Sequence, residues 1–284
     1  MNIAILGSSG FIGSHLVHSI SKQSYKAVEI NRNSLSEYFL DLEKPQNFNY
    51  DILDSCDFLI ITAAISNPDY CAESYEKAYR INVLSTKHVI NEAINRNCKV
   101  IFLSSDAVYG TDKGTCFNEQ NNTNPNTPYG LMKKEIEDSY YGSTLFKSAR
   151  LSYVISGEDK FIKYLFECKK QGNVAEVFHP FYRNCVTLSE VTDSLIWLLN
   201  NWGEFASPFL NICGCELVSR VAIVDEINRL SETKIKYKIV YPSEKFFINR
   251  PQITEMSSLY LNRILENHYK PFSMRLRSQL INKM

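Results

Sequence analysis

The chain has 284 residues, 44% of them hydrophobic, and its 31 lysines and arginines balance its 31 aspartates and glutamates. A chain of this length can bury a sizeable core, as one large domain or two small ones. Because a neutral chain has no overall basic field, nucleic acid and anionic membranes are not expected as partners. Apolar runs such as 58–65 are far shorter than the roughly 20 residues that span a bilayer, so we expect no membrane segment and a cytoplasmic protein.

The eight cysteines and five histidines are not spaced as metal ligands. No C-x-x-C motif is present, and the closest thiols, Cys213 and Cys215, flank a single glycine. Two thiols do not make a zinc site. We therefore expect reduced thiols and no metal.

Short apolar runs alternate with helical patterns in the first half of the chain. Strands are expected at 2–6, 26–30, 57–62 and 100–103, and helices at 11–21, 75–95 and from 129 onward. This alternation is typical of βαβ units and a buried parallel sheet. It predicts an α/β fold, with a Rossmann-type doubly wound parallel sheet.

The alternation loosens in the second half. Helices are expected at 160–171, 188–200, 219–231 and 254–266, strands at 209–213 and 235–241, and an exposed, proline-broken loop at 119–128. We expect a nucleotide-binding Rossmann domain formed by residues 1–155 plus about 184–230. A smaller, C-terminal substrate-binding region would comprise about 156–183 and 231–284.

A glycine-rich turn, GSSGFIG, joins the first strand to the first helix. Gly7 permits the tight turn, Gly10 lets backbone amides approach a pyrophosphate, and Gly13 allows the helix to pack closely on the strand. The positive end of the helix dipole would face the phosphates. This placement predicts dinucleotide binding. The residues expected to contact the dinucleotide here are Gly7, Ser9, Gly10, Phe11, Ile12 and Gly13.

The end of the second strand should lie near the adenosine ribose. NAD-specific sites usually carry an acidic residue there, bonded to the 2′-hydroxyl. This chain instead has Asn31 and Arg32. Asn31 brings no repulsive charge and Arg32 could pair with a 2′-phosphate, which favours NADP over NAD; the alternative is that Arg32 is a solvated surface residue. Asp41 and Leu42 are expected to line the adenine.

The pattern Tyr-x-x-x-Lys occurs three times, at Tyr109–Lys113, Tyr129–Lys133 and Tyr241–Lys245. Only the second match begins a proline-free helical stretch, 24 residues after Ser105 at the end of the fourth strand. Ligands of open parallel sheets sit beyond the carboxyl ends of the strands. At i and i+4, both side chains of this pair share a helix face. The sequence therefore favours Tyr129 and Lys133 as a proton-transfer pair.

The electrostatics of the pair are favourable. A free tyrosine titrates near pH ~10, so work near neutral pH requires a shift of roughly 3 units, or about 4 kcal/mol. A lysine charge about 5 Å away supplies about 3 kcal/mol at an effective dielectric of ~20. We expect Lys133 to lower the pKa of Tyr129.

With these motifs in place, the chain resembles the extended short-chain dehydrogenases/reductases that act on nucleotide sugars. The matching pieces are, in order, GSSGFIG, ITAA (61–64), YRINV with Asn82, SSDAVYG and PYGLMKK. Within that family the chain is most similar to the dTDP-4-dehydrorhamnose reductases, through 69–83 and 104–137 and more weakly through 184–191, 209–214 and 249–259.

The resemblance implies a Ser–Tyr–Lys mechanism. Tyr129 would donate a proton to a sugar ketone as hydride arrives from the nicotinamide. Ser105 would hydrogen-bond the same oxygen as its charge develops, and Lys133 would hold the ribose. Asn82 is expected to kink its helix or hold a water. The further residues expected beside the cofactor are Thr62, Ala63, Ala64, Ser104, Tyr129 and Lys133.

The sequence also departs from its relatives. Dehydratases of this superfamily carry an Asp-Glu pair after the Ser/Thr, whereas this chain has Asp106-Ala107, which argues against 4,6-dehydration. Lys160 stands where relatives usually have asparagine, and it would contact a substrate phosphate or lie on the surface. The residues expected at the substrate are Ser105, Asp106, Ala107, Tyr129, Lys160 and Arg250.

These observations favour an NADPH-dependent reductase of a nucleotide-linked 4-keto-6-deoxy sugar, serving surface polysaccharide synthesis. A nucleotide-sugar epimerase that retains NAD would use the same three catalytic residues. A third reading is a non-catalytic, nucleotide-binding regulatory subunit. The sequence is also compatible with a homodimer formed through an exposed pair of helices.

Overall fold

Seven parallel strands form the central sheet of the protein, which a computed structural model describes for residues 1–111, 114–266 and 270–280. The order across the sheet is β12-β7-β5-β4-β1-β2-β3. The bounds are β1 Asn2–Leu6, β2 Lys26–Asn31, β3 Tyr38–Phe39, β4 Phe58–Ile61, β5 Lys99–Ser105, β7 Phe146–Leu151 and β12 Phe209–Ile212. The chain runs outward from β1 in both directions, so the strand order reverses between β1 and β4. The predicted doubly wound Rossmann-type sheet is therefore confirmed.

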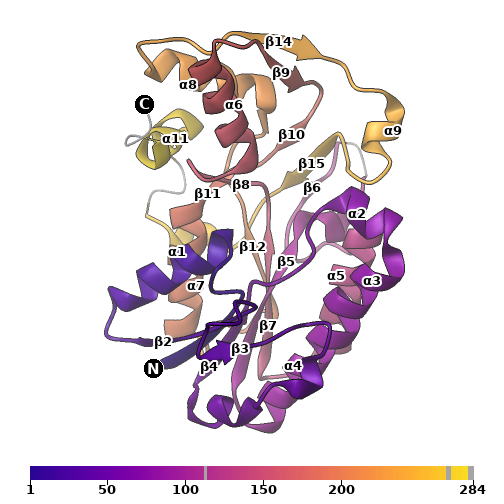
Figure 1. Cartoon of the computed structure of the whole chain (residues 1–284), viewed down its shortest axis with the longest axis vertical. Coiled ribbons are helices and arrows are strands. Elements are labelled where there is room, and N and C mark those ends of the chain that lie inside the picture. The colour runs from indigo at the N-terminus through magenta and orange to yellow at the C-terminus, as the bar shows by residue number, and fades with distance from the viewer. Residues whose placement is uncertain (112–113, 267–269, 281–284) are drawn as a thin grey trace.

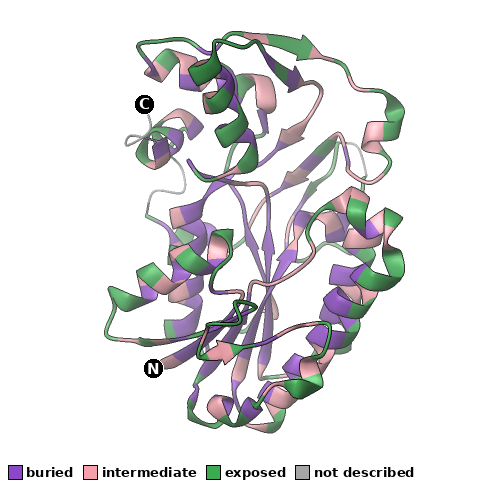
Figure 2. Ribbon diagram, viewed as in Figure 1, coloured by how far each residue is buried: buried purple, intermediate pink, exposed green. Residues whose placement is uncertain are grey.

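The sheet is covered on both faces, as its apolar strands require (Figure 1). Along β1, Ile3 and Ile5 pack on one side with helices α1 (Phe11–Ser21) and α7 (Leu188–Asn200). Ala4 and Leu6 pack on the other side with α4 (Thr86–Asn95) and α5 (Pro128–Ser139). Figure 2 shows the buried residues running along the central strands between these helix layers. Burial on both faces explains why these strands read as continuous apolar runs.

The long helix expected at 75–95 is not uniform. It consists of α3 (Tyr75–Tyr79), the π-helical segment η3 (Arg80–Ser85) and α4. Asn82 lies inside η3, where its side-chain oxygen accepts from Ile65 N at 2.8 Å and its amide donates to Ile65 O at 2.9 Å. π-bulges occur frequently at functional sites. Here the bulge ties the helix to the segment that follows β4.

A smaller region lies beyond the carboxyl ends of the strands (Figure 1). Its separate core is formed by apolar residues of α6 (Lys160–Gln171), β9 (Ala175–Phe178), α8 (Arg220–Leu230) and α11 (Phe272–Leu280). A four-stranded sheet of order β13-β10-β15-β6 adjoins it. Its strands are β13 Val218–Ser219, β10 Tyr182–Arg183, β15 Ile253–Met256 and β6 Cys116–Phe117. The remaining elements are η1 Pro45–Asn47, η2 Tyr50–Ser55, α2 Pro68–Glu73, η4 Asp106–Tyr109, β8 Val154–Ile155, β11 Val186–Thr187, β14 Tyr237–Val240, α9 Glu244–Phe247 and α10 Leu261–Ile264.

One expectation for the second half was wrong. The helix expected at 254–266 is mostly replaced by β15 and the single turn α10, because Ile253–Met256 pairs with both β10 and β6. The loop expected to be exposed at 119–128 is exposed or half-buried over 120–126, between the buried residues Glu119 and Thr127. Glu119 is buried because it accepts hydrogen bonds from Asn211 N and Leu259 N.

The packing bears on the domain boundaries. The buried side chains of α8 belong to the core of the smaller region, whereas Leu261 and Leu265 pack into the core of the Rossmann part. We therefore propose that α8 counts with the substrate-binding region, and that the chain returns to the Rossmann part near residue 261. Over the described ranges, no helix has the length and apolarity that a membrane crossing demands.

Candidate active site

The glycine-rich turn between β1 and α1 leaves no room for a side chain at Gly7 or Gly13. Gly7 has φ +94°, and a Cβ on Gly13 would lie 2.1 Å from Gly7 O. Within the described chain, no side chain caps the start of α1 and no acidic residue occupies its first turn. The amides of Gly7, Ser8 and Gly10 already donate to backbone oxygens of Ile30 and Gly7. The amides of the first turn of α1 are those that can meet an anion, with the helix dipole adding its positive end.

The end of β4 closes against the same turn. Thr62 Oγ1 donates to Leu6 O at 3.0 Å and Gly7 O at 3.2 Å, and Ala63 N donates to Leu6 O at 3.1 Å. A Cβ on Gly7 would meet Ala63 N at 2.8 Å. Thr62, Ala63 and Ala64 thus follow β4 at the same sheet edge as the glycines, where their cofactor contacts were predicted.

The end of β2 also belongs to this edge. Asn31 is buried, donates to Ser8 Oγ at 2.9 Å and accepts from Asn33 N at 2.9 Å, so its amide shapes the turn. Arg32 follows it and is exposed. The backbone oxygen of Leu42 accepts from Ser85 Oγ at 2.5 Å. Asp41 Oδ1 accepts from Glu43 N at 2.9 Å, and the contacts of Arg32, Asp41 and Leu42 with the adenosine stay predictions.

Helix α5 carries the tyrosine and lysine. Thr127 caps it, accepting from Gly130 N at 3.2 Å, and Pro128 is its first residue. A Cβ on Gly130 would lie 2.4 Å from Ala107 O, so this glycine lets the helix press against η4. The first turn of α5, with Tyr129, is thereby brought beside the end of β5.

The lysine of the pair is buried. Lys133 is 4% exposed, and its Nζ donates to Leu103 O at 2.7 Å. This nitrogen lies 5.7 Å from the centre of the Tyr129 ring and 4.3 Å from that of Phe102. Burial lowers the pKa of Lys133 to about 8, against the opposing effect of the Glu137 carboxylate.

The expectation that Lys133 lowers the pKa of Tyr129 was wrong for the protein alone. Burial raises the pKa of the Tyr129 phenol, and the nearby Cys71 and Asp106 raise it further. Desolvation penalises the phenolate, and Lys133 Nζ donates one of its hydrogens to Leu103 O. In the protein alone, burial therefore outweighs any stabilisation of the phenolate by Lys133.

Ser105 and Asp106 form a pair at the end of β5. Ser105 Oγ lies 3.0 Å from Asp106 Oδ1 and accepts from Ala107 N at 3.2 Å. Asp106 is buried, with Arg183 Nε 3.6 Å from Oδ2 and Ser152 Oγ at 3.5 Å. Burial raises the pKa of Asp106, and the Arg183 charge only partly opposes it.

Ser104 supplies a further sign of a missing ligand. Its side chain is 4% exposed, and its Oγ has no hydrogen-bond partner among the described residues. Buried polar groups are nearly always satisfied, so such an atom calls for an explanation. A nicotinamide dinucleotide fits these residues: the tight glycine turn, the uncapped α1 and the unsatisfied Ser104 all lie at one sheet edge.

Lys160 and Arg250, the two substrate residues predicted from the second half, come from segments that are distant in sequence from the glycine turn and from α5. Lys160 is exposed and begins α6, which Asp159 caps. Arg250 forms an ion pair with Asp69 of α2, to which Asn249 Nδ2 also donates at 3.3 Å. This contact bridges the smaller region and the Rossmann part. Substrate contacts of Lys160 and Arg250 stay predictions.

Arg183 and Ser152 also reach this site, and neither was predicted from the sequence. Arg183 belongs to β10, and its guanidinium donates to Tyr182 O at 2.6 Å and Pro251 O at 2.8 Å while facing Asp106. An isolated arginine in a polar stretch gives no periodic or motif signal. Its contacts come from strand pairing between distant segments, which the sequence does not display.

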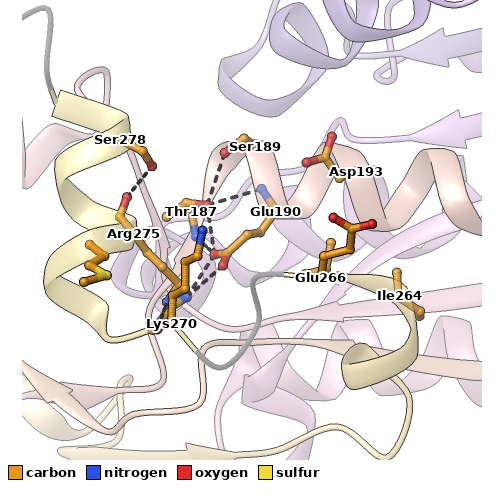
Figure 3. A pocket seen from close by; sticks show the side chains of 11 residues that line it. Thr187, Ser189, Glu190, Asp193, Ile264, Glu266, Lys270, Arg275 and Ser278 are labelled. Atoms are coloured by element: carbon orange, nitrogen blue, oxygen red, sulfur yellow. Dashed lines mark hydrogen bonds and ion pairs between the residues drawn. The ribbon is translucent and has the colours of Figure 1, made fainter.

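A separate hollow lies between α7, α10 and α11 (Figure 3). Figure 3 shows Glu190 and Arg275 joined across it, with Arg275 Nη1 donating to Glu190 Oε2 at 2.9 Å. None of the predicted site residues lines this hollow. Over the described chain, no group of three or more His, Cys, Asp or Glu residues could hold a metal ion.

Comparisons with known proteins agree with this geometry. The family model described as the RmlD substrate binding domain matches residues 1–282. CDP-abequose synthase of Salmonella typhimurium (strain LT2) is 26% identical over 223 residues, or 72% of each chain. UDP-glucose 4-epimerase of Yersinia enterocolitica is 30% identical over 157 residues, which cover 48% of this chain and 47% of the epimerase.

Two solved structures share the fold over nearly the whole chain. A dTDP-4-dehydrorhamnose reductase from Yersinia enterocolitica has a TM-score of 0.85 at 21% identity, covering 100% of this chain and 99% of that one. MoeE5 in complex with UDP-glucose and NAD has a TM-score of 0.81 at 20% identity, covering 99% and 98%. The resemblance inferred from the sequence is thus confirmed. The chain belongs to the RmlD substrate binding domain family and is an NAD(P)-dependent enzyme of the extended short-chain dehydrogenase/reductase type.

Proposed function

We propose that this enzyme is an NADPH-dependent reductase of a nucleotide-linked 4-keto-6-deoxy sugar. The observation that carries the proposal is the Ser105, Tyr129 and Lys133 set at the sheet edge that holds the glycine turn. Arg32, exposed directly after β2, supports NADPH as the cofactor because its charge suits a 2′-phosphate.

The three residues divide the work of reduction. When bound, the reduced nicotinamide supplies a hydride to the carbonyl carbon of the sugar. The Tyr129 O–H bond breaks as its proton passes to the carbonyl oxygen, and the tyrosinate later regains a proton from solvent. Ser105 donates a hydrogen bond to that oxygen while its negative charge develops. Lys133, next to the Tyr129 ring, stabilises the tyrosinate once it forms.

The residue after Asp106 supports reduction rather than dehydration. Removing water from the sugar requires an additional acid and base beside the catalytic serine. Ala107 follows Asp106 and carries no titratable group, and its backbone oxygen packs against Gly130. Asp106 alone can serve as an acid or a base here, whereas dehydration requires two such groups beside the serine.

The test is oxidation of NADPH by the pure enzyme with a panel of nucleotide-linked 4-keto-6-deoxy sugars. We expect one mole of NADPH consumed for each mole of sugar alcohol formed, with at least a ~100-fold loss in Tyr129→Phe because proton transfer contributes about 10²–10⁴-fold. Tyr141→Phe, on an exposed tyrosine of the same region, is the matched control. No oxidation across the panel, or equal rates in the two variants, would contradict the proposal.

An epimerase is the second candidate, because UDP-glucose 4-epimerase of Yersinia enterocolitica is among the similar proteins. An epimerase would copurify with NAD and interconvert two sugars with no net oxidation. Mass spectrometry of the nucleotides released from the pure protein separates the two candidates. A homodimer, a cytoplasmic location and a role in polysaccharide synthesis stay predictions.

A further inference from the structure

The pairing of Ser105 with Asp106 raises a question about hydrogen-bond direction. A hydroxyl group has one proton and two acceptor lone pairs. Ser105 Oγ already accepts from Ala107 N at 3.2 Å and lies 3.0 Å from Asp106 Oδ1. If Asp106 is a carboxylate, it must take the single Ser105 proton, and Ser105 then has none left for a ketone.

We propose that Asp106 is a positioning residue that acts through Ser105. As a carboxylic acid it donates to Ser105 Oγ and leaves the Ser105 proton for the carbonyl oxygen of the sugar. As a carboxylate it accepts a hydrogen bond from the Ser105 hydroxyl, and Ser105 then presents only a lone pair to the sugar, which suits a sugar hydroxyl instead. This inference rests on the proposed reductase function. Asp106 keeps its proton throughout the reaction, since the proton added to the sugar comes from Tyr129.

The surroundings of Asp106 make the acid form accessible. Its strongest hydrogen bond is the one to Ser105; Ser152 Oγ is at 3.5 Å and Arg183 Nε at 3.6 Å. The two Nη atoms of Arg183 are directed to backbone oxygens of Tyr182, Pro251 and Gln252. The Ala107 backbone N–H also interacts with this carboxyl group and, like Ser105, Ser152 and Arg183, favours its charged form. Burial is the larger effect and favours the neutral form.

Charged and titratable groups reach Asp106 from several elements. Arg183 on β10 lowers its pKa, whereas burial raises it more strongly. Tyr129 on α5 and the buried thiols Cys185 and Cys213 also interact with its charge. These three groups are neutral at neutral pH because their own pKa values are raised. Of the described groups named here, Arg183 is therefore the one that acts on Asp106 with a full charge.

Two variants of the same size separate hydrogen bonding from packing and charge. Asp106→Asn keeps a donor for Ser105, whereas Asp106→Leu has none, and both leave Arg183 without its carboxylate. We expect kcat/KM for the keto-sugar to be at least ~10-fold higher in D106N than in D106L, since a lost donor to a developing oxyanion costs about 10²–10³-fold. Equal values in the two variants would overturn the proposal.

The pH profile supplies a readout that a purely structural role would not move. In the native enzyme, kcat/KM for reduction should fall as pH rises through the titration of Asp106. That fall should be absent in D106N, and absent again in Ser105→Ala, because the effect passes through Ser105. If kcat/KM still falls with rising pH in either variant, this contradicts the relay, by which we mean the action of Asp106 through Ser105.

A spectroscopic measurement tests the relay even if no keto-sugar is reduced. The infrared difference between the native protein and D106N should show the band of a protonated carboxylic acid at pH 6. In Ser105→Ala this band should shift, because the acid loses its acceptor. Absence of the band, or no shift in S105A, overturns the relay. Inactivity of the native enzyme toward the whole panel, with the band present, instead counts against the proposed reductase function.

Discussion

Breaking the ion pair between Glu137 and Arg150 should destabilise the protein strongly. Glu137 lies one turn after Lys133 on α5, and Arg150 lies on β7; their side chains are 2% and 3% exposed. Glu137 accepts from Arg150 Nη2 at 2.7 Å, from Nε at 3.0 Å and from Ser148 Oγ at 2.8 Å. Arg150 Nη1 also donates to the Tyr109 hydroxyl at 2.9 Å. The pair thus fastens the catalytic helix to the sheet.

The expected loss of stability is large because both charged groups of the pair are buried. Glu137→Gln keeps the shape but leaves the buried guanidinium without its countercharge, which typically costs about 3–5 kcal/mol. The matched control is Asp138→Asn on the same helix. Asp138 pairs with Lys134 at 2.6 Å, but its side chain is 61% exposed. Such an exposed i,i+4 pair contributes about 0.3–0.5 kcal/mol.

Urea denaturation at pH 7 measures both changes as free energies of unfolding. We expect the loss in E137Q to exceed the loss in D138N by at least about 2 kcal/mol. A loss in E137Q below about 1 kcal/mol would refute the reasoning, since the guanidinium would then have found solvent or another partner.

Two further predictions concern the glycine turn and the catalytic lysine. Gly13→Ala should cost about 1–3 kcal/mol of stability through the clash with Gly7 O, and should weaken NADPH binding at least ~10-fold. Gly203→Ala, whose Cβ meets nothing within 4 Å, should do neither. Urea denaturation and fluorescence titration with NADPH measure the two effects, and equal behaviour of the two variants would refute the prediction. Because the folded-state pKa of Lys133 is about 8, below its ordinary 10.5, the unfolded chain binds more protons between these values and stability rises with pH there. Relative to Lys133→Met, the native protein should therefore gain about 3 kcal/mol between pH 7 and 10.5, and an unchanged difference would show that this amine is not neutral in the fold.

The strands that could be predicted are those whose apolar sequence follows from burial on both faces. β1, β4 and the start of β5 are buried on both faces and read as apolar runs. β7 is equally buried, yet its sequence FKSARL conceals it. Lys147 is tolerated there because Nζ donates to Ser207 O at 3.2 Å, and Arg150 because of Glu137. Ser207 lies 60 residues from Lys147, and Glu137 lies 13 residues from Arg150 on a different element, so periodicity could not reveal this strand.

The candidate site likewise has features that the sequence predicts and features that it does not. Spacing together with position along the chain brought out the glycine turn, between a strand and a helix, and the Tyr129–Lys133 pair, at a helix start after the Ser105 strand. The protonation states did not follow from spacing: Tyr129 has a raised pKa and Lys133 a lowered one, since burial dominates both. Burial of a side chain depends on how distant segments pack, as the approach of Arg183 to Asp106 shows.

The contact between Arg250 and Asp69 has a consequence for access to the site. It joins the smaller region to α2 through an ion pair and one amide, with the Asp69 side chain 44% exposed. Separating such a contact exposes charged groups that water solvates well, and little hydrocarbon. Breaking this contact therefore costs little free energy, and dissolved salt should weaken it. A phosphate-bearing ligand that reached Arg250 would compete with Asp69 for its guanidinium.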